Sequence, residues 1–166
     1  KSSASSLQVI FNIFRQRVVK DLLNIASSNN VGIIARVPLA SGLLTGKFSK
    51  EHQFAESDHR NFNSDGQLFN VGETFAGVPF DLGIEFANEV EGILSKELDE
   101  ATLAQKSLRW ILDHDEISTV IPGATTSKQA AQNAEVSAMN SISRKAYADL
   151  KFLYDEKIDS SVRGRY

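Results

Sequence analysis

Two apolar runs separated by a stretch with helical spacing begin the chain. The runs, LQVIFN at residues 7–12 and VGIIARV at residues 31–37, are rich in strand-favouring residues, and Pro38 ends the second. Between them, apolar residues recur every three or four positions over residues 18–26. A strand, a helix and a strand within about 30 residues predict a βαβ crossover with two parallel strands.

Further along, the spacing of apolar residues predicts three more helices, over residues 82–98, 100–112 and 143–157, and a third strand over residues 117–121. Asp99 is expected to cap the helix that starts at residue 100. The sequence TSKQ at residues 126–129 fits the capping box of another helix. This alternation of strands and helices favours a parallel α/β fold.

Three parallel strands leave two sheet edges and an apolar face that these helices cannot fully cover, so we expect the rest of the sheet to come from elsewhere. Residues 47–80 mix polar and aromatic residues without any period. A loop of that length within a compact domain is usually functional or disordered. We expect it to act as a lid.

Composition excludes several classes of protein. The chain is 42% hydrophobic and 23% charged, as in one ordinary globular domain, and its apolar runs are far shorter than the roughly 20 residues that span a bilayer. No secretion signal opens it, and it has no cysteine, which fits a cytoplasmic protein. A net charge of −3 argues against nucleic acid. A local group of cations can still hold a small anion, and the candidates are Arg36, Lys47, Lys50 and Arg60.

Two strands are followed by loops of unusual composition, RVPLASGLLTGK at residues 36–47 and IPGATTSKQAAQN at residues 121–133. In a (β/α)8 barrel, ligands lie at the C-terminal ends of the strands, and phosphate is often held by the last two such loops with a helix N-terminus. Glycines let the backbone approach a phosphate closely. These two loops therefore predict a phosphate site.

The order of these motifs resembles the aldo-keto reductase family. The pattern comprises Pro-Leu-x-Ser-Gly-x-Leu-x-Gly-Lys, a long loop, a helix with Leu-Arg-Trp, Ile-Pro-Gly after a strand, and a helix with Gln-x-x-x-Asn, and it extends from Gln8 to beyond Asn133. The resemblance is to the branch that includes potassium-channel β subunits and bacterial general-stress reductases. It implies that residues 1–166 are the C-terminal part of one (β/α)8 barrel domain, with parallel strands and outer helices.

The resemblance also implies which residues contact a nicotinamide dinucleotide. Gln8 matches the glutamine that meets the nicotinamide carboxamide, and Arg36 stands where many relatives stack an aromatic ring on the nicotinamide, a place where a guanidinium could stack instead. Lys47 matches a lysine near the phosphates, and Arg60 an arginine beside the adenosine end. The loop around the pyrophosphate corresponds to Val37, Pro38, Leu39, Ser41 and Gly42. The contacts to the adenosine phosphate and adenine correspond to Gly123, Thr125, Gln129, Gln132 and Asn133.

The family's catalytic Asp, Tyr, Lys and His lie on earlier strands, and none can be placed in this chain. The resemblance therefore implies the C-terminal, NADP(H)-binding part of a reductase that acts on aldehydes or ketones by hydride transfer. The carbonyl substrate is expected to bind only in the complete barrel. The expected protein partner of this chain is the N-terminal part of the barrel or a second copy of this chain. No catalytic residue and no metal site is predicted here, because His52, His59 and His114 lack the spacing of metal ligands.

Alternatives remain for the identity of the cofactor and for the activity. Many family members have a lysine and an arginine where this chain has Gly123 and Gln129, so NADP is favoured over NAD only if Lys47, Arg60 or Lys128 supplies the missing charge. A non-catalytic nucleotide-binding or self-associating fragment is the alternative to an enzyme. A scaffold that has lost the cofactor altogether is a third possibility.

Overall fold

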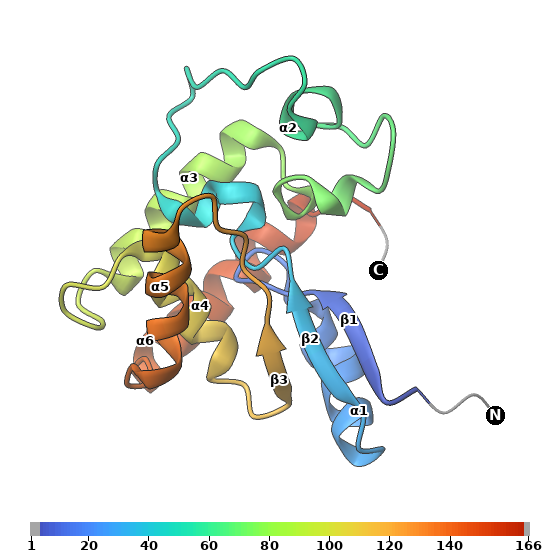
Figure 1. The fold of residues 1–166 in the computed structure, drawn as a ribbon, viewed down its shortest axis with the longest axis vertical. Helices are drawn as coiled ribbons and strands as arrows, with labels where there is room; N and C mark the ends of the chain where they lie inside the picture. Colours follow the sequence, from blue (N-terminus) through green and yellow to red (C-terminus); the bar gives the residue numbers. More distant parts are fainter. Residues whose placement is uncertain (1–3, 165–166) are drawn as a thin grey trace.

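The computed structural model describes residues 4–164, and its three strands form one parallel sheet in the order β1-β2-β3 (Figure 1). The strands are β1 (Ser6–Ile10), β2 (Gly32–Arg36) and β3 (Ile117–Val120). The three predicted strands and their parallel arrangement are confirmed. Each strand is shorter than the apolar run that predicted it, because the backbone turns at the C-terminal end. Asn12 and Arg15 form a tight bridge after β1, and Val37 has a φ of 51° after β2.

Helices and helical turns make up most of the remaining chain. In sequence order they are η1 (Val19–Leu23), α1 (Asn24–Ser28), η2 (Ala40–Thr45), α2 (His59–Phe62), η3 (Val71–Glu73), η4 (Phe75–Gly77), α3 (Phe80–Leu94), α4 (Leu103–Leu112), α5 (Ser127–Glu135), η5 (Val136–Ala138), α6 (Arg144–Leu153), η6 (Tyr154–Ile158) and η7 (Asp159–Ser161). The π turn η1 runs directly into α1, and together they form the predicted crossover between β1 and β2.

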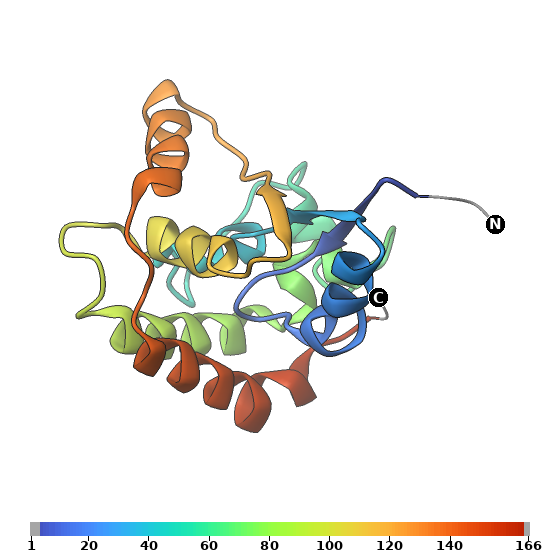
Figure 2. The same cartoon turned by 90° about the horizontal axis from the view of Figure 1, so that it is seen from below.

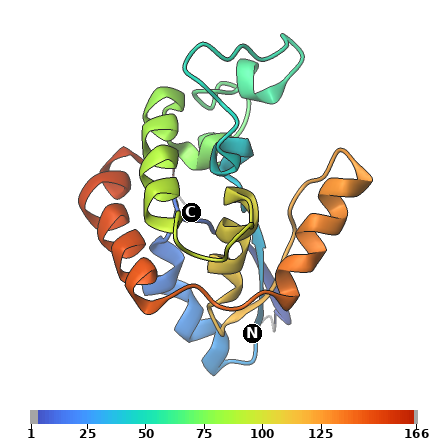
Figure 3. The same ribbon diagram turned by 90° about the vertical axis from the view of Figure 1, so that its left-hand side faces the viewer.

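The core lies between the sheet and the outer helices. Figure 2 shows α4 next to the sheet, with α3 and α6 running side by side in an outer layer. Trp110 of α4 is 1% exposed, and its ring centroid lies 5.2 Å from that of Phe11 and 5.8 Å from that of Tyr147 in α6. Figure 3 shows α5 on the opposite side of the molecule from α3 and α6. Trp110 is therefore a packing residue that joins two layers.

The predicted start of α4 was wrong. Asp99 does not cap it, and α3 ends at Leu94, because the connection turns back through Leu98, which has a φ of 48°. Thr102 caps α4 instead, in a capping box with Gln105: the Gln105 N–H donates to Thr102 Oγ1 at 3.2 Å, and the Thr102 N–H donates to Gln105 Oε1 at 3.0 Å. The last predicted helix is confirmed as α6 with its continuation η6.

The long loop, residues 47–80, is packed rather than free. The fully buried Asn63 accepts the N–H groups of Leu68 and Phe69 at 2.9 and 3.0 Å. From the other end of the chain, the Arg163 N–H donates to Gly77 O at 3.0 Å, and its guanidinium donates to Asp65 at 2.6 Å. The loop therefore has a defined path over the C-terminal ends of the strands.

The outer edges of β1 and β3 have no further strand beside them among residues 4–164. This is the arrangement expected of a segment of a larger sheet. In the same part of the chain, no helix combines the length and the apolar character needed to cross a membrane.

Candidate functional site

A cavity of about 840 Å³ lies at the C-terminal ends of β2 and β3. Its walls come from the loop after β2, the long loop, the start of α4, and the loop after β3 with α5. Twelve of the fourteen residues predicted to contact a dinucleotide line it: Val37, Pro38, Leu39, Ser41, Gly42, Lys47, Arg60, Gly123, Thr125, Gln129, Gln132 and Asn133. Residues up to 96 positions apart in the sequence are thus brought together around one space.

The first wall is the loop after β2, whose backbone is left-handed at several positions. Val37, Ala40 and Ser41 have φ angles of 51°, 48° and 55°, and Gly42 has a φ of 102°. A Cβ at Gly42 would also lie 2.9 Å from the Phe48 ring, so both the conformation and the space require glycine there. These turns fold the loop back on itself, with the Ala40 N–H donating to Val37 O at 3.1 Å and the Gly42 N–H donating to Leu39 O at 2.9 Å.

The opposite wall is the loop after β3 and the start of α5. Thr126 caps α5 as predicted, since its Oγ1 accepts the Gln129 N–H at 3.2 Å. The return bond of the predicted capping box is different: Gln129 Oε1 accepts from the N–H of Thr125 at 2.8 Å rather than from Thr126. Asn133 donates to Gly123 O at 3.4 Å, and a Cβ at Gly123 would meet nothing within 4 Å. The helix N-terminus and the open backbone at Gly123 both suit an anion.

Cations on the long loop complete the cavity. Arg60 is held by Asp58 through two hydrogen bonds of 2.9 and 2.6 Å, and its guanidinium carbon lies 4.5 Å from the centroid of the Phe54 ring. The hydrogen bonds from Arg60 lower the pKa of Asp58 to about 2. Lys47 is exposed and has no hydrogen-bond or ion-pair partner among the described residues. The charge of Arg60 is therefore compensated within the protein, whereas that of Lys47 is not.

The remaining two predicted residues, Gln8 and Arg36, line a second cavity of about 450 Å³ beside β1. Its other walls include the apolar side chains of Leu7, Val9, Ile10, Val18 and Leu22. Arg36 forms a bidentate ion pair with Glu73 of the long loop, and Glu73 lines the larger cavity. The hydrogen bonds to Glu73 raise the pKa of Arg36. The structure thus divides the predicted residues between two neighbouring cavities that meet at this ion pair.

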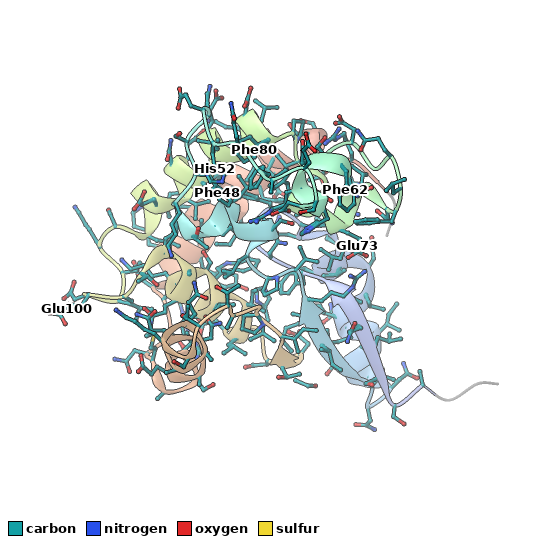
Figure 4. The ribbon with its side chains drawn as sticks, turned by 45° about the horizontal axis from the view of Figure 1, so that its top comes forward. Phe48, His52, Phe62, Glu73, Phe80 and Glu100 are labelled. Carbon is teal, nitrogen blue, oxygen red and sulfur yellow. The ribbon has the colours of Figure 1, made fainter. Side chains whose placement is uncertain are left out.

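Sequence reasoning missed several residues of the site. Glu73 had no local signal, because its partner lies 37 residues away. Asp58 had one, since it is an N-cap residue two positions before a predicted cofactor contact. The aromatic side chains of the long loop form a cluster behind Arg60, and Figure 4 shows Phe48, His52 and Phe80 close together, with Glu73 on the side nearer β1 and β2.

Metal-ligating side chains do not gather within residues 4–164, where no group of three or more His, Cys, Asp or Glu residues has a suitable arrangement. His52 packs against the rings of Phe48 and Phe54, with centroid distances of 4.6 and 4.7 Å. His114 is buried beside Trp110 and Tyr147 on the other side of the molecule from the cavity. Neither histidine contacts the candidate site's polar groups.

Solved structures with the same fold are aldo-keto reductases. The glycerol dehydrogenase AKR11B4 from Gluconobacter oxydans matches 97% of this chain with a TM-score of 0.73 at 19% identity, and the chain covers 45% of it. The aldo-keto reductase AKR11C1 from Bacillus halodurans matches 92% with a TM-score of 0.59 at 16% identity, and 44% of it is covered. The predicted fold class, a partial (β/α)8 barrel with parallel strands, is confirmed.

Sequence comparison gives relatives of the expected branch. A probable voltage-gated potassium channel subunit beta from Oryza sativa subsp. japonica is 32% identical over 126 residues, which cover 74% of this chain and 35% of that protein. The L-glyceraldehyde 3-phosphate reductase of Escherichia coli K12 is 29% identical over 153 residues, or 81% of this chain and 36% of that protein. The chain therefore spans little more than a third of these relatives. Residues 1–155 match the model of the Aldo/keto reductase family. The chain belongs to the aldo/keto reductase family.

Proposed function

We propose that the two cavities hold a nicotinamide dinucleotide, with its phosphates and adenosine in the larger cavity and its nicotinamide end in the smaller. The observation that carries this proposal is the convergence of twelve predicted contact residues on one cavity of about 840 Å³. That cavity also has the features that suit phosphate: a helix N-terminus, the open backbone at Gly123 and the uncompensated charge of Lys47. The smaller cavity has a mainly apolar surface that suits a flat ring, and the amides of Gln8 and Asn70 line it and can meet a carboxamide. The charged side chains of Arg15, Asp21 and Arg36 line the same cavity.

NADP(H) is the cofactor we propose, with NAD(H) as the alternative. Lys47 is the cation within the larger cavity that can meet a further phosphate, because Arg60 is already paired with Asp58. Lys128 lies at the start of α5 but does not line the cavity. This charge pattern predicts only a modest preference for the phosphorylated cofactor.

In the complete protein, we propose that this chain forms the C-terminal, cofactor-binding part of one barrel domain of a cytoplasmic reductase acting on aldehydes or ketones. When bound, the dinucleotide supplies the hydride for that reaction. The residues of this chain bind and orient it, whereas the proton donor must come from outside residues 1–166. The relatives named as reductase and dehydrogenase support this assignment of the reaction class.

Titration with NADPH, followed by its fluorescence, tests the binding proposal. Saturable binding with a Kd in the micromolar range is expected, and Lys47→Gln should weaken it by roughly 10- to 150-fold, since a hydrogen bond to a charged group contributes about 1.5–3 kcal/mol. Lys50→Gln is the matched control, because Lys50 is also a loop lysine but pairs with Glu85 outside the cavity. A flat titration would show that the cavity does not bind the dinucleotide.

A non-catalytic, self-associating module is the second candidate, and the open edges of β1 and β3 favour it. Sedimentation equilibrium on the 18.3 kDa chain distinguishes the two. A stable dimer or larger assembly that binds NADPH without turnover is expected of the module. A monomer would argue against self-association.

A further inference from the structure

The Arg36–Glu73 ion pair lies where the two cavities meet. Arg36 is at the C-terminal end of β2 and lines the smaller cavity, whereas Glu73 is in η3 of the long loop and lines the larger one. Arg36 Nη1 donates to Glu73 Oε2, and Arg36 Nη2 donates to Glu73 Oε1. A ligand that extends from one cavity into the other has to pass this pair.

The position of Glu73 is fixed by its backbone as well as its side chain. The Ser41 hydroxyl donates to Glu73 O at 3.2 Å and accepts the Phe75 N–H at 3.0 Å, and the Glu73 N–H donates to Asn70 O at 3.0 Å. The side chains of Arg36 and Glu73 are only 31% and 28% exposed. The pair is therefore a fixed part of the wall, unlike the exposed pairs elsewhere on the surface, such as Lys50–Glu85.

The oxidised and reduced forms of the cofactor differ in charge at the nicotinamide ring, and not at the phosphates. A nicotinamide ring carries one positive charge in its oxidised form and none in its reduced form. An uncompensated guanidinium beside the ring would disfavour the oxidised form, and the carboxylate of Glu73 offsets that effect. The phosphates are the same in both forms, so a change of charge at the larger cavity alone would shift both affinities together.

We propose that Glu73 is a specificity-determining residue which, by neutralising and orienting Arg36, sets the relative affinities of this site for oxidised and reduced nicotinamide dinucleotide. The inference rests on the proposed function, because it needs the nicotinamide end in the smaller cavity. It assigns a role to a residue that no pattern in the sequence identified.

The test measures Kd for NADP⁺ and NADPH in the wild-type chain and three variants: Glu73→Gln, Arg36→Gln and the double variant. Glu73→Gln should raise the ratio of Kd for NADP⁺ to Kd for NADPH about tenfold, because it leaves Arg36 charged and unpaired beside the ring. Arg36→Gln leaves the carboxylate unpaired, so it should lower the same ratio by a similar factor. The double variant has neither charge and should return the ratio to within about twofold of the wild type.

Glu85→Gln is the control, since it removes a carboxylate from an exposed ion pair away from both cavities and should leave the ratio unchanged. Opposite signs in the two single variants cannot come from a merely structural role, which would weaken both forms alike. If circular dichroism shows that one single variant does not fold, the direction in which the Kd ratio changes in the other single variant and the ratio in the double variant still test the inference. Equal changes for both cofactor forms would overturn this inference and leave the proposed function intact. Absence of binding by the wild type would overturn the proposed function itself.

Discussion

Replacing His114 should change how the stability of this protein depends on pH. His114 follows α4 and is 8% exposed, with its ring centroid 4.8 Å from those of Phe11 and Trp110. Its Nδ1 lies 3.1 Å from Trp110 O and 3.3 Å from Ile111 O, so Nδ1 carries the hydrogen, because a carbonyl can only accept. The neutral ring then accepts the Tyr147 hydroxyl at Nε2.

Burial lowers the pKa of His114 below its ordinary value, although the two carbonyl contacts and the nearby Asp113 and Glu116 act in the opposite direction. The unfolded chain therefore binds a proton more readily than the folded chain. The stabilising contribution is complete above the unfolded pKa of about 6.5 and is lost as the pH falls from that value through the lower pKa of the folded state. The loss between pH 7.5 and 5.5 can reach about 1.4 kcal/mol.

Urea denaturation at pH 7.5, 6.5 and 5.5 measures this contribution as a difference between proteins. His114→Gln is uncharged at each pH, so its free energy of unfolding should fall less than that of the wild type as the pH decreases, by up to about 1.4 kcal/mol. His52→Gln removes an exposed imidazole and serves as the matched histidine-to-glutamine substitution outside the core. Parallel curves for the wild type and His114→Gln would refute the argument from burial.

Other substitutions give effects of known direction. Gly83→Ala in α3 would place a Cβ 2.5 Å from the buried Leu43, so it should destabilise by about 1–3 kcal/mol, whereas Gly92→Ala in the same helix meets nothing within 4 Å and should stabilise by up to about 1 kcal/mol in urea denaturation. Thr102→Ala removes the capping box of α4 and should cost about 1 kcal/mol in the same assay. Asn63→Ala should remove the acceptor of the Leu68 and Phe69 N–H groups and speed amide hydrogen exchange in the long loop, and unchanged protection there would contradict the anchoring role of its side chain.

The parts of the fold that local sequence determines could be predicted. The strands are continuous apolar runs. The loop after β2 contains Gly42, whose φ of 102° requires glycine, so the sequence already marks this turn. The start of α4 was mistaken although the signal was present, since Thr102 is followed by Gln105 in the spacing of a capping box, which Asp99 lacks. Asp99 and Thr102 are both good N-cap residues, and what distinguishes Thr102 is the bond from its N–H to the Gln105 side chain.

The parts of the site that depend on distant contacts could not be predicted. Glu73 reaches Arg36 because the buried Asn63 fixes the loop between them and because Ser41 holds the Glu73 backbone. The spacing of residues in the sequence does not predict the path of an irregular loop. The charge balance of the cavity follows from the same contacts, so the compensation of Arg36 also required the structure.

The hydrogen bonds from residue 163 to the long loop have a consequence for synthesis on the ribosome. Arg163 bonds Gly77, which precedes it by 86 residues, and also Ser64 and Asp65. A chain that emerges from its N-terminus can form the sheet and both flanking loops of the cavity before this arginine exists. The long loop that contains Glu73 gains these bonds only when residue 163 has been added, so its anchoring comes after translation of the strands, helices and loops that surround the site.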